Sequence, residues 1–249
     1  MRYLLTFLFC ILVTSNAYAT DPDSFPDDPW MKNFWGGCNY NIVKLKHVEN
    51  NNVFWRFVLE KGDVGGCSMD PTERHGASYW ERKEVRGRRL KSGSTYEIQF
   101  KVRFIKGFEG NRETFFQIHG HWSRVAVCLS PLLTFKFGEL GKSWSPDYWA
   151  RLAITEHGGK YEVNHAQNFG PIDKIKGIWQ HVKFIFETNV GTSKYWLYLG
   201  DKLLISDEEF YIPACKIPFI KFGIYRPGDP KYGKTSIVDF DDVKVTKVR

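Results

Sequence analysis

Three strand-like segments of the sequence place polar side chains that can do chemistry on alternate residues. In the segment 113–120, Gln117 and His119 are separated by one apolar residue. Because successive side chains of a strand point to opposite faces, the amide and the imidazole are expected on one surface, with Phe116 and Ile118 directed into a core. A histidine that is merely satisfied at a sheet edge would give the same pattern.

A second segment, 218–226, repeats this arrangement near the end of the chain. Lys221, Gly223 and Tyr225 share one predicted face, and apolar residues occupy the other. The small glycine indicates room for a ligand between two long polar side chains, although a glycine within a strand also marks a bulge or a close approach of two backbones. The alternative is an ordinary amphipathic strand with a solvent-facing lysine and tyrosine.

A third segment, 78–86, places Arg82, Glu84 and Arg86 on one face. A guanidinium group matches a carboxylate in a bidentate pair, so this face is suited to hold an acidic sugar. The basic run continues to Arg89, and a charge cluster of this kind is more often the solvated end of a strand.

The elements that must position these residues are predicted to be strands. Apolar and polar residues alternate along 96–104, as in a half-buried strand. Short β-branched or aromatic segments separated by Gly, Pro, Asn or Asp clusters occur elsewhere, and no convincing amphipathic helix is present. These segments are 53–59, 132–137, 181–187, 194–205 and 236–248. The pattern predicts an all-β sandwich or jelly roll in one unit.

Composition and charge narrow the class of protein further. The chain has 249 residues, of which 43% are hydrophobic and 16% aromatic, so a disordered tail or a coiled coil is excluded. Lys and Arg number 35 against 28 Asp and Glu, a net charge of +7. This surplus favours a polyanionic partner without saying which one.

The first residues predict export. Arg2 precedes an apolar run, and small residues follow at Ala17 and Ala19, so residues 1–19 are expected to be a signal peptide and 20–249 a single domain. The run is too short to span a membrane, and no later stretch is long enough. A secreted or periplasmic location makes nucleic acid an unsuitable partner.

Cysteine usage agrees with an oxidising compartment. Four cysteines remain after the predicted cleavage, which allow one or two disulfides in three pairings that the sequence leaves open. They are Cys38, Cys67, Cys128 and Cys215. Their spacing does not resemble a zinc site.

The order of the three motifs resembles a known family. The sequence resembles the bacterial polysaccharide lyases with a jelly-roll fold, which are related to alginate lyases and heparin lyase I-like enzymes. The resemblance lies in three motifs in the same order, Arg-x-Glu at Arg82, Gln-x-His at Gln117 and Lys-x-Gly-x-Tyr-Arg at Lys221. The resemblance covers residues 78 to 226. It implies a concanavalin A-like β-jelly-roll sandwich of two antiparallel sheets with a concave substrate groove.

The same resemblance implies roles for individual residues. Arg82 and Gln117 would neutralise the carboxylate of a uronate, and His119 would act near the C5 proton. Tyr225 would be the acid, and also the base if the proton and the leaving group lie on the same side of the sugar ring. If they lie on opposite sides, His119 would be the better base.

The expected substrate is a uronate-containing anionic polysaccharide, cleaved by β-elimination in a protein that we expect to be a monomer. The expected substrate-binding residues are Glu84, Arg86, Lys221, Trp122 and Arg226. No organic cofactor or catalytic metal is expected, and the sequence leaves a structural calcium ion open without indicating one. His119 and His121 as a metal pair is the less favoured interpretation.

Two other functions fit the same sequence. A jelly roll can bind carbohydrate without cleaving it, because fold does not fix activity. A retaining glycoside hydrolase needs two close carboxylates, and the nearest approach to such a pair is the acidic run Asp239, Asp241 and Asp242, which we interpret as an edge or ion-binding feature.

Overall fold

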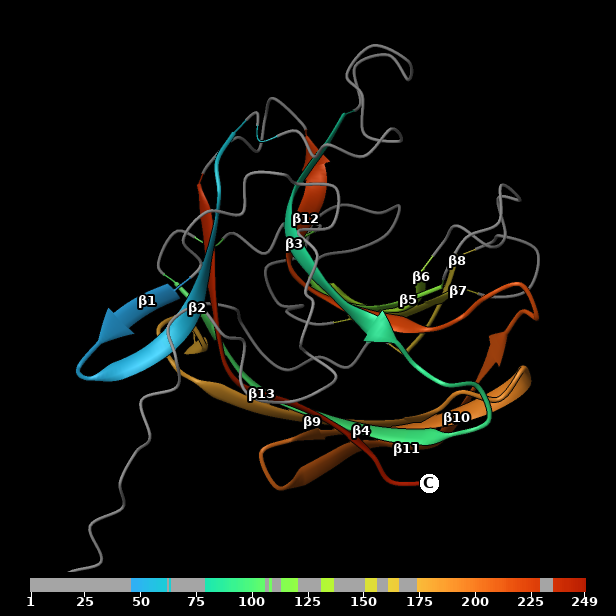
Figure 1. The fold of residues 1–249 in the computed structure, drawn as a ribbon. Helices are drawn as coiled ribbons and strands as arrows, with labels where there is room; N and C mark the ends of the chain where they lie inside the picture. Colours follow the sequence, from blue (N-terminus) through green and yellow to red (C-terminus); the bar gives the residue numbers. More distant parts are fainter. Residues whose placement is uncertain are drawn as a thin grey trace, which may run out of the picture.

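The protein is described by a computed structural model. It covers residues 46–61, 63, 79–105, 108, 113–120, 131–136, 151–155, 161–165, 174–228 and 235–249. In these residues the chain forms strands and no helix, arranged as two stacked antiparallel sheets (Figure 1). The predicted all-β jelly-roll class is confirmed. No described segment is a helix that could span a membrane.

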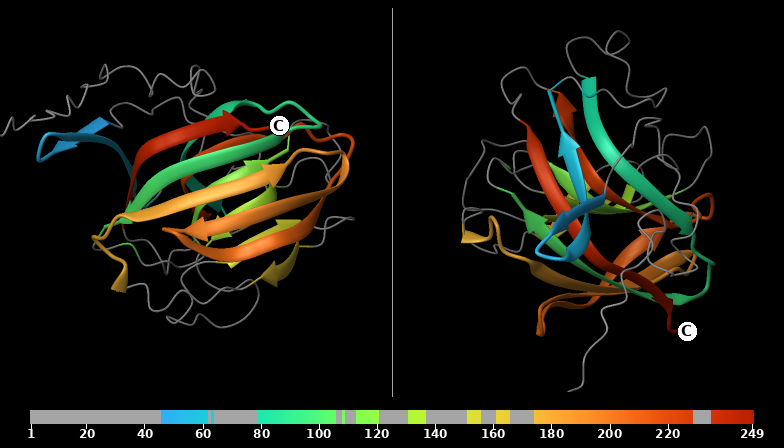
Figure 2. Two further views of the ribbon diagram at one scale, coloured as in Figure 1. Left: turned by 90° about the horizontal axis from the view of Figure 1, so that it is seen from below. Right: turned by 60° about the vertical axis from the view of Figure 1, so that its left-hand side comes forward.

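The larger sheet has seven strands in the order β1-β2-β13-β4-β9-β10-β11. Seen from below, its long strands lie in front of the shorter strands of the other sheet (Figure 2). Their bounds are β1 (Lys46–Glu49), β2 (Asn52–Leu59), β13 (Ser236–Lys247), β4 (Thr95–Phe104), β9 (Gln180–Glu187), β10 (Gly191–Leu199) and β11 (Lys202–Ile212).

The smaller sheet has six strands in the order β3-β12-β5-β6-β7-β8. It contains all three segments that carry the predicted chemistry. Their bounds are β3 (Tyr79–Arg89), β12 (Phe219–Gly228), β5 (Thr114–His119), β6 (Pro131–Lys136), β7 (Arg151–Thr155) and β8 (Tyr161–His165).

The core between the sheets follows from the period-two pattern. Along β4 every second residue from Tyr96 to Phe104 is buried, and the residues between them are half-buried. Aromatic rings join the two sheets: Phe100 of β4 stacks on Phe116 of β5 with ring centroids 5.0 Å apart. Each fully buried ring of this size contributes roughly 1.5–3 kcal/mol through removal from water, so the apolar face of the smaller sheet is firmly anchored.

The first hairpin shows how local sequence sets the register. Asn50 and Asn51 have φ angles of 50° and 62°, and Glu49 pairs with Asn52 across the turn. Positive φ at both central residues is the requirement of a type I′ turn, and asparagine tolerates that conformation better than most residues. The two asparagines therefore fit the turn that joins β1 to β2.

Most strand predictions are confirmed, and the differences are of two kinds. The segment 194–205 is not one strand, because Gly200 and Asp201 form a turn that separates β10 from β11. Strands β1, β7 and β8 were not predicted. β1 has only four residues and β7 and β8 five each, which is too short for alternation to stand out.

Candidate active site

The register of β12 brings the three motifs together. β12 lies between β3 and β5, and Lys221 pairs with Arg86 on one side and Gln117 on the other. Tyr225 pairs with Arg82. Residues that face each other across antiparallel strands present their side chains on the same side of the sheet. Segments more than a hundred residues apart in sequence, such as those of Arg82 and Tyr225, therefore contribute to one surface.

We call this surface the polar face. It lies on the side of the smaller sheet turned away from the larger one, because the alternate residues, such as Phe116 and Phe222, pack in the core between the sheets. The position of β3 and β12 above the larger sheet can be followed in Figure 1. The polar face consists of Arg82, Glu84, Arg86, Gln117, His119, Lys221 and Tyr225.

Glu84 is at the centre of the polar face and is 4% exposed. Its Oε1 accepts a hydrogen bond from the Gln117 amide. Its Oε2 lies 3.4 Å from Arg82 Nη1 and 3.6 Å from Lys221 Nζ. A buried carboxylate held by an amide and two cations orients those groups. Glu84, itself one of the predicted substrate-binding residues, is thus buried with both carboxylate oxygens engaged, and it orients Arg82, Gln117 and Lys221.

Arg82 and Tyr225 form the pair that the register predicts. The guanidinium carbon of Arg82 lies 4.4 Å from the centroid of the Tyr225 ring. The cation is therefore close to the phenol and favours negative charge that develops there. Tyr225 is half-buried, whereas Lys221 is 9% exposed.

His119 is oriented by its own backbone and by a stacked ring. Nδ1 lies 2.7 Å from the carbonyl oxygen of Gly120, and Phe219 stacks on the imidazole with centroids 5.2 Å apart. Since a carbonyl only accepts, Nδ1 carries the proton and Nε2 keeps its lone pair. Burial, followed by the charge of Lys221, lowers the pKa of His119 to about 3. The imidazole is neutral at ordinary pH.

Two residues near His119 were missed by sequence reasoning. Phe219 lies between the imidazole and Arg86, whose guanidinium carbon is 5.5 Å from its ring centroid. Lys216, before β12, is 3% exposed, and burial lowers its pKa to about 8. Alternation along β12 points to Phe219, which shares a face with Lys221. No pattern points to Lys216, because it lies outside any strand.

Glycine is required at position 223 because two backbones approach each other there. Its φ is 136°, and a Cβ atom there would lie 2.1 Å from the carbonyl oxygen of Lys83 on β3. β12 also has one extra residue opposite β5 between Phe222 and Tyr225, which is a β-bulge. Of the two interpretations offered by the sequence, the bulge with a close approach of two backbones is confirmed, and it accounts for the glycine without room for a ligand.

Arg226 lies on the opposite face from the other predicted site residues. It is 3% exposed, and its Nε and Nη1 lie 2.6 Å from Glu81 and 3.1 Å from Glu113. Nη1 also donates a hydrogen bond to Ser236 of β13, so the side chain joins the two sheets. The prediction that Arg226 binds substrate from the polar face is therefore wrong, because its guanidinium is buried in a structural cluster.

Other predicted residues fall into two groups. Arg86 is half-buried on the polar face, where burial and the neighbouring Arg89 lower its pKa. Trp122 and His121 lie outside the described residues, as do residues 1–19 and the cysteines other than Cys215. Within the described part of the chain, no three His, Cys, Asp or Glu side chains are grouped as metal ligands.

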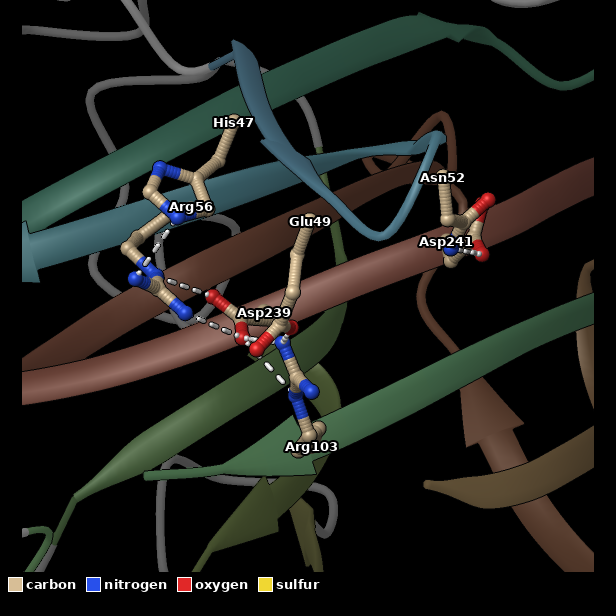
Figure 3. A network of polar contacts seen from close by, with 7 residues as sticks. All are labelled: His47, Glu49, Asn52, Arg56, Arg103, Asp239 and Asp241. Atoms are coloured by element: carbon tan, nitrogen blue, oxygen red, sulfur yellow. Dashed lines mark hydrogen bonds and ion pairs between the residues drawn. The ribbon is translucent and has the colours of Figure 1, made fainter. Parts of the chain in front are cut away.

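A second polar cluster lies on the larger sheet (Figure 3). Asp239 of β13 is fully buried and accepts hydrogen bonds from Arg56 and Arg103 at 2.7–3.0 Å. Arg103 also contacts Glu49 at 2.6 Å. We call these four residues the Asp239 cluster. The interpretation of Asp239 as an ion-binding residue is wrong, because both of its carboxylate oxygens accept hydrogen bonds from arginines.

Comparison with known proteins defines the fold class. No protein-family model and no curated protein matches the sequence. Among solved structures, the chain is similar to alginate lyase A1-II′, a member of polysaccharide lyase family 7, with 13% identity and a TM-score of 0.56 over 82% of this chain and 84% of that one. The fold is thus that of the jelly-roll alginate lyases, as the motifs predicted.

Two further neighbours have the same fold. The alginate lyase vAL-1 from Chlorella virus is 10% identical, with a TM-score of 0.52 over 81% of this chain and 88% of its own. The family 7 alginate lyase AlgAT5 is 12% identical, with a TM-score of 0.51 over 86% of both chains. At such identities the likeness shows the fold, and activity must be argued from the polar face.

Proposed function

We propose that the protein is a polysaccharide lyase that cleaves a uronate-containing anionic polysaccharide by β-elimination and releases unsaturated oligosaccharides. The observation that carries this proposal is the register of β12, which aligns cationic, amide, imidazole and phenol groups from three strands on the polar face. The fold shared with alginate lyases supports it.

The difficult step of the reaction is removal of the C5 proton. Abstraction leaves a carbanion next to a carboxylate, so cationic and hydrogen-bonding groups must stabilise the added negative charge. Arg82 provides a permanent charge, and the Gln117 amide provides donors that do not titrate. Glu84 engages one N–H of that amide, which holds Gln117 in place and leaves its second N–H for the sugar carboxylate.

Tyr225 is the proposed acid and base. The proton leaves C5, a C4–C5 double bond forms, the C4–O bond breaks and the departing oxygen receives a proton. A base is most effective when its pKa is near the working pH, and His119, with its pKa lowered to about 3, holds a proton weakly. This favours removal and donation of the proton by Tyr225 on one side of the ring, with neutral His119 as a hydrogen-bonding partner.

Arg86 and Lys221 are the proposed contacts for neighbouring carboxylates of the polymer, and Trp122 for a sugar ring. The net charge of +7 agrees with a polyanionic substrate. We further propose export through a signal peptide at residues 1–19, one or two disulfides among the four remaining cysteines, and a monomer that needs no organic cofactor.

The rival activities differ in what the polar face must contain. A retaining glycoside hydrolase needs two carboxylates about 5–5.5 Å apart. Among the polar-face residues whose side chains are described, Glu84 is the one carboxylate, while Glu81 and Glu113 contact Arg226 on the inner side. A non-catalytic binding protein would keep the same surface and release no product.

The test uses the purified protein with a panel of alginate, glucuronan and heparan-type polymers. A lyase produces an unsaturated sugar end, which absorbs in the ultraviolet, and a hydrolase produces a saturated reducing end. Salt-sensitive binding with no product would identify a binding protein. If every uronate polymer in the panel remains intact, the proposed activity is wrong for these substrates.

Variants then test the site. Tyr225→Phe removes one hydroxyl and is expected to lower turnover by about 10²- to 10⁴-fold. Tyr211→Phe, an exposed tyrosine of β11 in the larger sheet, is the matched control and should retain turnover. His119→Ala is also expected to abolish turnover in a folded protein. Wild-type turnover in both Tyr225→Phe and His119→Ala would remove the site assignment.

A further inference from the structure

Lys216 packs against the residue that follows His119. A Cβ atom on Gly120 would lie 2.4 Å from Lys216 Cδ, 2.6 Å from Cγ and 3.0 Å from Cβ. Real atoms do not approach so closely, so the aliphatic part of Lys216 occupies the space that a side chain at position 120 would need. The contact requires glycine at that position.

The same glycine orients the imidazole. The carbonyl oxygen of Gly120 accepts the hydrogen bond from His119 Nδ1, which fixes the tautomer and directs the lone pair of Nε2. Phe219 covers one side of the ring. Lys216 therefore contacts the backbone segment on which the orientation of His119 depends.

Charge acts at the same place. The described cations that act on His119 come from three elements: Lys221 on β12, Lys216 before β12 and Arg82 on β3. The Gly120 carbonyl opposes them, and Glu84 is paired with Arg82 and Lys221. Lys216 is 3% exposed, so solvent screens its charge little.

We propose that Lys216 is a positioning residue for His119. The aliphatic stem of Lys216 holds the Gly120 carbonyl in place, and its ammonium group disfavours positive charge on the imidazole. This inference rests on the proposed lyase function for its purpose, because a neutral, oriented imidazole beside the C5 proton is what the reaction needs. The low pKa of His119 supports it.

Two substitutions separate the two roles. Lys216→Met keeps most of the stem and removes the charge, while Lys216→Ala removes both. The readout is nuclear magnetic resonance of the His119 ring, assigned by comparison with His119→Gln, which reports the titration midpoint and the tautomer without any substrate. Lys202→Met, an exposed lysine of β11, is the control.

In Lys216→Met, the titration midpoint of His119 is expected to rise, by less than the removal of Lys221 would cause, while the Nδ1–H tautomer is retained. In Lys216→Ala, the tautomer preference is expected to weaken as well, and turnover on a cleaved polymer should fall about tenfold. Lys202→Met should change neither. If the midpoint and tautomer in both Lys216 variants equal those of the wild type, the inference is overturned.

Gly120→Ala provides an independent measure of the contact. Alone, it should displace the Lys216 stem and reduce the free energy of unfolding. Combined with Lys216→Ala, its cost should be much smaller, because the occupied space is vacated. Strictly additive costs would contradict the contact. If no polymer is cleaved while the His119 midpoint and tautomer respond as expected, the lyase function fails and the positioning by Lys216 stands.

Discussion

The two sheets each carry arginines next to a buried carboxylate, yet the two arrangements differ in how well charge is matched. In the Asp239 cluster, one fully buried carboxylate accepts hydrogen bonds at 2.7–3.0 Å from Arg56 and Arg103. On the polar face, the closest cation atoms to Glu84 lie at 3.4 and 3.6 Å. A buried carboxylate with two cations thus forms a tight cluster in one sheet and a looser one in the other.

The surroundings of the two clusters explain this difference. Arg103 lies over the rings of Phe54 and Trp179, 4.9 and 4.6 Å from their centroids, so it is held from several sides. This supports a structural role that ties β1, β2, β4 and β13 together. On the polar face, Arg82, Arg86 and Lys221 outnumber the one described carboxylate. An excess of cations is suited to bind an added carboxylate, which a matched cluster is not.

The largest expected effect concerns pH at the polar face. Burial lowers the pKa of His119 to about 3, so between that value and about 6.5 the unfolded chain binds a proton that the folded chain does not. The free energy of unfolding should therefore fall as pH drops through this window, by on the order of 4 kcal/mol from this group.

Urea unfolding at pH 7 and pH 3 measures that change. His119→Gln removes the titrating group, so its loss between the two pH values should be smaller than that of the wild type by a similar amount. A constant offset between the two proteins would not affect the comparison. Equal losses in both proteins would show that His119 titrates normally in the folded state.

The next largest effect is expected in the Asp239 cluster. Asp239→Asn removes the charge that Arg56 and Arg103 share, and leaving partly buried cations without their partner should cost about 3 kcal/mol of unfolding free energy. Turnover per folded molecule should stay the same, because the cluster lies on the other sheet. Denaturant unfolding and the activity of the folded fraction measure both quantities.

Asp241→Asn is the matched control on the same strand. Asp241 is half-buried and accepts hydrogen bonds from the Asn52 amide and the backbone N–H of Asp242, both in exposed positions that an asparagine oxygen can also serve, so the substitution should cost less than about 1 kcal/mol. If the two variants lose equal stability, the Asp239 cluster does not have the structural role that its tight geometry indicates.

The bulge of β12 is the third test. Gly223→Ala places a Cβ atom 2.1 Å from the Lys83 carbonyl at a φ of 136°, so about 2 kcal/mol should be lost and turnover should fall as Tyr225 shifts. Gly93 also has a positive φ, of 69°, but has open space around it. Gly93→Ala should cost about 1 kcal/mol and leave turnover unchanged. If Gly223→Ala and Gly93→Ala had equal effects on turnover, the bulge would not be what positions Tyr225 for the reaction.

Much of this arrangement follows from period-two alternation. A strand side chain can point in only two directions, so alternation predicts which residues of one strand share a face. It groups Arg82 with Glu84 and Arg86, Gln117 with His119, and Lys221 with Tyr225. It also predicts that Arg226 points away from Tyr225, yet Arg226 was grouped with the site through the family motif. Its partners Glu81 and Glu113 are 145 and 113 residues away, and alternation does not reveal such pairs.

Other features depend on strand pairing that no local pattern encodes. The role of Gly223 is set by the backbone of β3, and Lys216 packs against Gly120, which follows β5. Neither partner is near in sequence. The tight cluster around Asp239 likewise requires the order β2-β13-β4, which brings Arg56 and Arg103 to either side of one aspartate.

The smallest effect is expected for an exposed ion pair, which shows that distance alone does not set the contribution of a charge pair. Lys101 Nζ lies 2.5 Å from Asp242, closer than any cation to Glu84, but the two side chains are 41% and 59% exposed. Solvent screens such a pair, and holding two mobile side chains together costs entropy, so Lys101→Met should change stability by at most about 0.5 kcal/mol. A loss as large as that of Asp239→Asn in the same urea titration would contradict the view that burial, more than proximity, distinguishes the structural cluster from the surface.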